Sequence, residues 1–123
     1  MTLKEAPAVA WEQYLISSYS LWGVAKNTPG YENTYAFIKL NLAAPGIRPT
    51  LWFHRDGGPA IPPNSVSSNG LVYGRFTERA FADLSGILRS EKPVFFCWNP
   101  ESKGVFLATS DEPVGEQETP VVV

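Results

Sequence analysis

Apolar and polar residues alternate most clearly in residues 34–42, TYAFIKLNL. One side of an extended chain here carries Ala36, Ile38, Leu40 and Leu42, and the other carries Tyr35, Phe37, Lys39 and Asn41. A period of two predicts a strand whose aliphatic side faces the core. The opposite side sets two aromatic rings beside a lysine and an amide. These rings serve either as cross-strand aromatic pairs or as a contact surface.

Five further stretches are rich in branched and aromatic residues and predict strands. Residues 50–56, TLWFHRD, place Leu51, Phe53 and Arg55 on one face and Thr50, Trp52 and His54 on the other. The other stretches are 14–26, 70–76, 93–98 and 104–108, the last two forming a hairpin around NPESKG. Gly23 is expected to mark a bend or bulge. Residues 57–70 are rich in Gly, Pro and Ser, which argues against regular structure.

Residues 77–91 predict the chain's long helix. Thr77 is a good N-cap residue, Phe76 and Phe81 have the spacing of a hydrophobic staple, and Glu78 would sit in the first turn. One apolar stripe contains Ala80, Phe81, Leu84, Ile87 and Leu88. Gly86 inside the helix suggests close approach of a strand. A helix with one apolar face should cover an open end or face of the sheet.

The predicted fold is mainly β, within the α+β class. We expect a small OB-like barrel or half-barrel of about six mostly antiparallel strands, with one capping helix over 77–91. The order of elements resembles the OB-type barrel, in which a helix caps the barrel between two strands. A sandwich with one docked helix is the alternative. We expect a leader over 1–13, in which Pro7 could open a short helix through AVAWEQ, then one domain over 14–110 and an acidic, flexible tail over 111–123.

The composition of the chain fits one globular domain and argues against a strongly basic nucleic-acid binder and against a membrane-spanning or secreted protein. The 123 residues carry a formal net charge of -2, and the pI is about 5.3, which is unlike a strongly basic nucleic-acid binder. Residues 1–110 hold all 10 basic residues and 8 of the 12 acidic ones, so the body is slightly basic and the tail acidic. No membrane-spanning or secretory segment is evident, and the expected localisation is cytoplasmic.

Residues that carry catalytic chemistry are scarce. The single His54 and single Cys97 cannot build a Cys/His zinc site within one chain, and Cys97 is expected to be buried. There is no phosphate-binding glycine loop and no HExxH motif. His54 and Arg55 are adjacent on a strand, so their side chains point to opposite faces. The sequence therefore argues against an enzyme and predicts no metal and no cofactor.

Three functions remain open. The first is a binding module for a partner protein or for a second copy, using exposed aromatic residues as anchors. The second is a single-stranded nucleic-acid binder, in which Arg48 would join the cations near the rings. The third is a small-molecule site or enzyme near His54, under the 57–70 loop. The candidate binding residues are Tyr35, Phe37, Lys39, Trp52, His54, Arg55 and Arg75.

Overall fold

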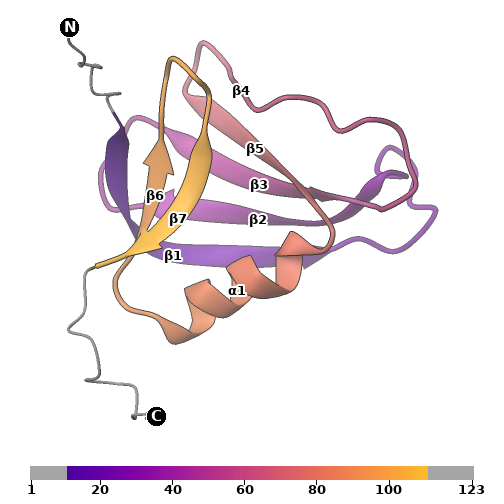
Figure 1. Cartoon of the computed structure of the whole chain (residues 1–123), viewed down its shortest axis with the longest axis horizontal. Coiled ribbons are helices and arrows are strands. Elements are labelled where there is room, and N and C mark those ends of the chain that lie inside the picture. The colour runs from indigo at the N-terminus through magenta and orange to yellow at the C-terminus, as the bar shows by residue number, and fades with distance from the viewer. Residues whose placement is uncertain (1–10, 111–123) are drawn as a thin grey trace, which may run out of the picture.

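The computed structural model describes residues 11–110 and contains one sheet and one helix. The elements are β1 (Glu12–Gly23), β2 (Thr34–Leu42), β3 (Arg48–His54), β4 (Ser65–Val66), β5 (Leu71–Thr77), α1 (Ala80–Ser90), β6 (Val94–Trp98) and β7 (Val105–Thr109). The sheet order is β4-β5-β3-β2-β1-β6-β7, and every pair is antiparallel except β3 with β5. The sheet curls into a half-barrel, as predicted (Figure 1).

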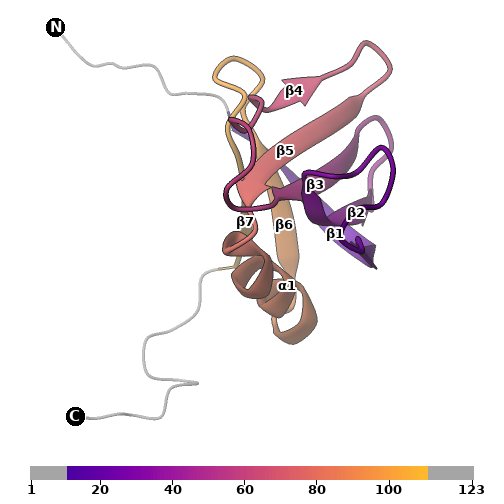
Figure 2. The ribbon, with the colours of Figure 1, turned by 90° about the vertical axis from the view of Figure 1, so that its right-hand side faces the viewer.

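The core lies on the concave side of the curled sheet. Ile38, Leu51, Phe53 and Phe96 are completely buried there, as the alternation in the sequence predicts for the first three. Helix α1 lies across one end of the sheet and covers this core (Figure 2). The predicted apolar stripe does pack against the core, and Leu88 is its most buried member, with 8% exposed.

The start of the helix differs from the prediction. The helix begins at Ala80 with Arg79 as its N-cap, and no side chain caps it. Thr77 instead continues β5, opposite His54 in the parallel ladder. The Glu78 N–H donates to the His54 carbonyl at 2.9 Å, and the Glu78 carboxylate accepts from the Asp56 N–H at 2.8 Å. Strand pairing therefore outweighs the local capping signal, because two tertiary hydrogen bonds hold the segment extended.

Phe76 and Phe81 also form no staple at the helix start. Both rings pack on Phe53 instead, with ring centres 5.4 Å and 5.2 Å from it. The prediction for Gly86 is wrong as well, since no atom lies within 4 Å of the position that a Cβ would occupy there. Phe53 is thus the residue that joins β3, β5 and α1.

The ends of several elements shift from their predicted positions. Strand β1 already includes Glu12 and Gln13, and Trp11 before it is not helical, so these three residues are not part of a short helix. Residues 1–10 of the predicted leader lie outside the described residues. The irregularity in β1 falls at Ser17, between the pairs Ile16–Leu42 and Ser18–Asn41, and not at Gly23. Residues 55 and 56 lie beyond β3, and β4 interrupts the loop that was expected to be irregular. The acidic tail over 111–123 lies outside the described residues.

Candidate binding surface

The convex side of the sheet carries a row of aromatic rings across three neighbouring strands. The register sets Trp22 of β1 opposite Phe37 of β2, and Phe37 opposite Trp52 of β3. The Trp22 and Phe37 rings stack with centres 5.6 Å apart and planes 9° apart, and the Phe37 and Trp52 centres are 4.7 Å apart. We call Trp22, Phe37 and Trp52 the aromatic row. Neighbouring rings of this kind stabilise each other beyond the area they bury.

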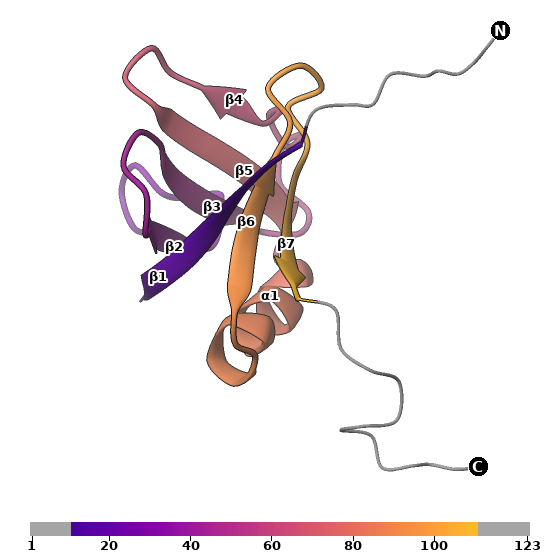
Figure 3. The ribbon, with the colours of Figure 1, turned by 90° about the vertical axis from the view of Figure 1, so that its left-hand side faces the viewer.

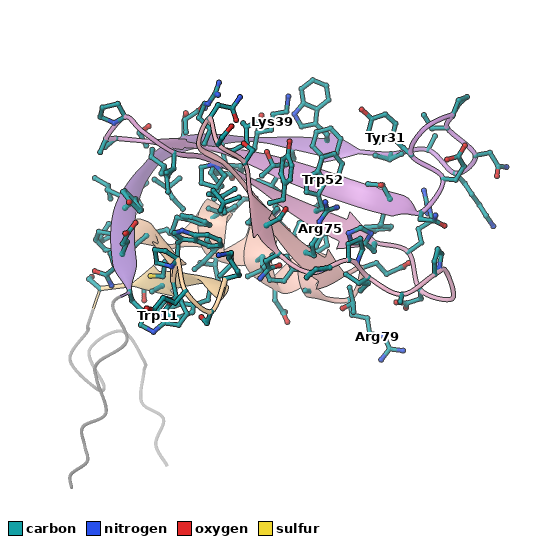
Figure 4. The ribbon with its side chains drawn as sticks, turned by 90° about the horizontal axis from the view of Figure 1, so that it is seen from above. Trp11, Tyr31, Lys39, Trp52, Arg75 and Arg79 are labelled. Atoms are coloured by element: carbon teal, nitrogen blue, oxygen red, sulfur yellow. The ribbon has the colours of Figure 1, made fainter. Side chains whose placement is uncertain are left out.

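Tyr31 reaches this row from the loop between β1 and β2. Its ring centre lies 6.2 Å from that of Phe37 and 6.3 Å from that of Trp52 (Figure 4). The loop is a series of tight turns, in which the Tyr31 N–H donates to the Thr28 carbonyl and the Thr34 N–H donates to the Tyr31 carbonyl, each at 3.0 Å. Gly30 has φ of 83°, a conformation that glycine adopts at little cost. The turns thus fix the position of an exposed ring.

Two exposed rings and one nearly buried ring surround a hollow on the convex side, beside the loop between β1 and β2. Trp22 is 49% exposed and Tyr31 is 41% exposed, whereas Phe37 below them is only 9% exposed. A hollow of about 300 Å³ is lined by Trp22, Tyr31 and Phe37 together with the backbone turn that follows β1. Two accessible aromatic walls over an aromatic floor suit an apolar side chain of a ligand.

Cations flank the aromatic row on both sides. The Lys39 Nζ lies 5.3 Å from the centre of the Trp22 ring, and the Arg75 guanidinium lies 5.9 Å from that of Trp52. Both are within the range of favourable cation–π contact. Figure 4 shows Lys39, Trp52 and Tyr31 on the same side of the sheet, with Arg75 beside Trp52. Arg48, at the start of β3, is exposed on the same side.

The convex face as a whole is positively charged. Its outward-facing residues from β1 after the bulge, β2, β3 and β5 include Lys39, Arg48 and Arg75, and no Asp or Glu stands among these described positions. The whole chain, in contrast, has more acidic than basic residues. The charge on this face is therefore concentrated locally and favours a partner that carries negative charge.

The rings of this surface stack on one another, so each stacked pair covers part of its ring faces. Trp22 and Phe37 are nearly parallel in an offset stack, and Tyr31 is within 19° of the Trp52 plane. Nucleic-acid platforms need aromatic faces that are free to stack with bases. The arrangement here presents ring edges and the outer faces of Trp22 and Tyr31, which is more typical of aromatic anchors in a protein interface.

Two of the predicted site residues do not belong to this surface. A bulge in β2, between the pairs Thr34–His54 and Ala36–Phe53, turns Tyr35 toward the helix, where its ring lies nearly perpendicular to that of Phe81 with ring centres 5.6 Å apart. Arg55 lies over the Tyr35 ring and donates from its Nη2 to the Val24 carbonyl at 2.7 Å. Arg55 therefore connects the ends of β1 and β3 and lies away from the aromatic row. A bulge re-aims side chains in a way that simple alternation cannot predict.

His54 lies apart from the row, beside a hollow of about 360 Å³ under the long loop. The residues that line this hollow include Gly30, Tyr31, Asn33, Pro59 and Pro62. Burial lowers the pKa of His54, and the nearby Arg75 guanidinium lowers it further. The side chain is therefore neutral at pH 7. The His54 Nε2 is buried and has no hydrogen-bond partner among the described residues.

Asp56 does not pair with Arg55, its neighbour in the sequence. Its carboxylate lies 3.5 Å from the Arg79 Nε, and both groups are exposed. Within residues 11–110, no three His, Cys, Asp or Glu side chains are close enough to hold a metal ion. Cys97 is buried, as expected, and burial raises the pKa of its thiol. In the same part of the chain, no helix is long and apolar enough to cross a membrane.

Sequence reasoning missed the two most accessible rings of this surface, Trp22 and Tyr31. The face of Trp22 depends on the bulge at Ser17, which shifts the alternation along β1. Tyr31 stands in a turn, where no periodicity applies, although its position directly after Pro29-Gly30 marks it as a loop-tip residue. A second exposed pair, Trp11 and Phe106, lies on another part of the molecule with ring centres 4.7 Å apart (Figure 4).

Comparison of the chain with protein-family models, curated proteins and solved structures gave no significant match.

Proposed function

We propose that this protein is a non-catalytic binding module whose convex face engages a partner protein. The observation that carries the proposal is the aromatic row with Tyr31, a set of large rings held in register and partly exposed on a structured face. Large aromatic residues supply most of the binding energy in many protein interfaces. Rings that are already fixed by their neighbours lose little conformational entropy on binding.

The charge of the face points to an acidic partner. Lys39 and Arg75 hold their cationic groups beside the rings. An acidic segment with one apolar anchor could place the anchor between Trp22 and Tyr31 and its carboxylates near these cations. Charges at the rim of an interface mainly set the association rate and its salt dependence, whereas buried rings set affinity.

Single-stranded nucleic acid is the second candidate. It is favoured by one observation, the three cations without a carboxylate on the convex face. The stacking weighs against it, because neighbouring rings cover part of the faces on which bases would stack. Phosphate contacts are strongest at low salt, so binding of an oligonucleotide is easiest to detect there.

Affinity capture with matched variants tests the proposal. The wild-type protein, Trp22→Ala and Phe106→Ala would each be immobilised, and bound proteins from cells that express the chain would be quantified. Phe106 is 45% exposed and belongs to a different surface, which makes it the matched control. A partner identified in this way would then be purified and its Kd measured. Trp22→Ala should weaken binding by about 30-fold, the effect of a typical interface hot spot of ~2 kcal/mol.

Two results would count against the proposal. Equal loss of the partner with Phe106→Ala would move the interface to the Trp11–Phe106 surface. Tight binding of a labelled thymidine 20-mer at low salt, lost with Lys39→Ala, would favour the nucleic-acid function instead.

A further inference from the structure

Strand β1 leaves part of one edge unpaired. Along its length β1 pairs with β2 on one side, from Ile16 to Gly23. On its other side it pairs with β6 only from Glu12 to Leu15. Strand β6 begins only at Val94, and the chain before it comes from α1, so β6 does not extend beside the rest of β1. Figure 3 shows β1 running away from β6 over this second half.

The backbone groups on this free edge can be assigned from the hydrogen bonds of the ladder. The Val24 N–H donates to the Tyr35 carbonyl at 3.0 Å. Alternate residues of an antiparallel strand bond to the same neighbour, so Ser20 and Trp22 also face β2. The N–H and C=O groups of Tyr19, Leu21 and Gly23 therefore point away from β2. In the described part of the chain no other strand lies on that side.

The free edge borders a groove beside the helix. A hollow of about 620 Å³ lies between Ile16–Tyr19 of β1 and the segment from Leu88 to Val94. Leu21 continues the apolar side of this edge and is 41% exposed, although it faces the concave side opposite the buried Ile38. On the convex side the same strand presents Ser18 and Ser20. The groove is thus apolar toward the core and polar on its outside.

We propose that the edge of β1 from Ser18 to Gly23 binds an extended peptide segment of a partner protein as an additional strand. Unpaired strand edges recognise extended backbone, since only such a chain offers N–H and C=O groups at matching intervals. The two sides of the groove define the ligand further. Its alternate residues should be apolar where they meet Leu21 and Leu88, and polar where they lie beside Ser18 and Ser20. This site uses the free backbone edge of β1, the strand that also carries Trp22 of the aromatic row on its convex side, and it goes beyond the function proposed above.

Amide hydrogen exchange by NMR on the full chain tests the inference. The probe is a blocked peptide in which valine and threonine alternate between two terminal lysines. At saturating peptide the amides of Tyr19 and Leu21 should exchange at least about tenfold more slowly, because they become hydrogen-bonded. The same peptide with N-methylated valines lacks the donors on one edge and should give no slowing.

Two substitutions of Leu21 test whether the peptide binds through the backbone of this edge, provided that each variant stays folded. Leu21→Pro removes an N–H on the free edge of β1 and leaves the bonds to β2 intact, so it should abolish peptide binding. Leu21→Lys keeps the backbone and places a charge on the apolar side, a common means of protecting edge strands, and it should also abolish binding. Ser20→Thr is the control that should bind the peptide like wild type. Each variant must keep the amide spectrum of a folded chain.

Three results would overturn the inference. The first is unchanged exchange of Tyr19 and Leu21 at every peptide concentration. The second is slow exchange of the same two amides before any peptide is added, if deletion of residues 111–123 makes that exchange fast. The chain's own end would then occupy the edge. The third is protection that rises with protein concentration, which would assign the edge to a second copy of the chain.

Discussion

Replacing Phe53 by alanine should lower the free energy of unfolding strongly, whereas replacing a residue of the proposed binding surface should lower it little. Phe53 is completely buried, and its ring packs against both Phe76 and Phe81. Removing a buried phenylalanine ring costs about 3–5 kcal/mol, which includes the cavity left behind. The two aromatic contacts add about 0.5–1.5 kcal/mol each beyond burial, so the loss should lie toward the upper end of that range.

Trp22→Ala is the matched comparison, since Trp22 is also a large aromatic residue on the same sheet. Half of its surface is already exposed, so its removal should cost about 1 kcal/mol of stability. The assay is urea unfolding followed by circular dichroism, with the midpoint and slope fitted for each variant. Phe53→Ala should lower the unfolding free energy by at least about 3 kcal/mol. Equal losses for the two variants would refute the assignment of Phe53 to the core and Trp22 to the surface.

Further predictions concern two glycines and the single histidine. Gly86→Ala should raise the unfolding free energy by about 0.5–1 kcal/mol, because the site is open and alanine is a better helix former; a loss of stability would contradict this. Gly70→Ala should destabilise, because Gly70 has φ of 85° and an added Cβ would collide with the Gly46 carbonyl oxygen; unchanged stability in the same urea assay would show that the loop moves freely. Because burial lowers the pKa of His54 in the folded state, its contribution to stability should be present above its ordinary pKa of 6.5 and be lost as the pH falls below it. Wild type should therefore lose more stability than His54→Gln between pH 7 and pH 5, and parallel curves for the two proteins would contradict the shift.

The sequence predicts the overall fold because its strands follow simple rules. The alternation in residues 34–42 identifies the buried side of β2, and the apolar stripe of the helix identifies the face that covers the core. Both signals act within a single element, so no knowledge of the remaining chain is required.

The details of the candidate site depend on contacts between distant parts of the chain. Phe37 and Trp52 are predicted to face away from the core and do lie together. Tyr35 stays exposed but turns from the convex face toward the helix, because of a bulge in β2. Thr77 pairs with His54 and does not cap the helix, since ladder bonds outweigh its local preference. Trp22 and Tyr31 join the surface through a second bulge and a turn, and neither is visible as a periodic pattern.

Site-specific photo-crosslinking tests the central claim most directly. A benzophenone amino acid would replace Trp22 in one version of the chain and Phe106 in another, and both would be irradiated in cells that express the protein. We expect the position of Trp22 to form a defined crosslink to one protein, and the position of Phe106 to form none to it. Crosslinks from the position of Trp22 to nucleic acid, or crosslinks to the same protein only from the position of Phe106, would contradict the assignment of the convex face as a protein-binding surface.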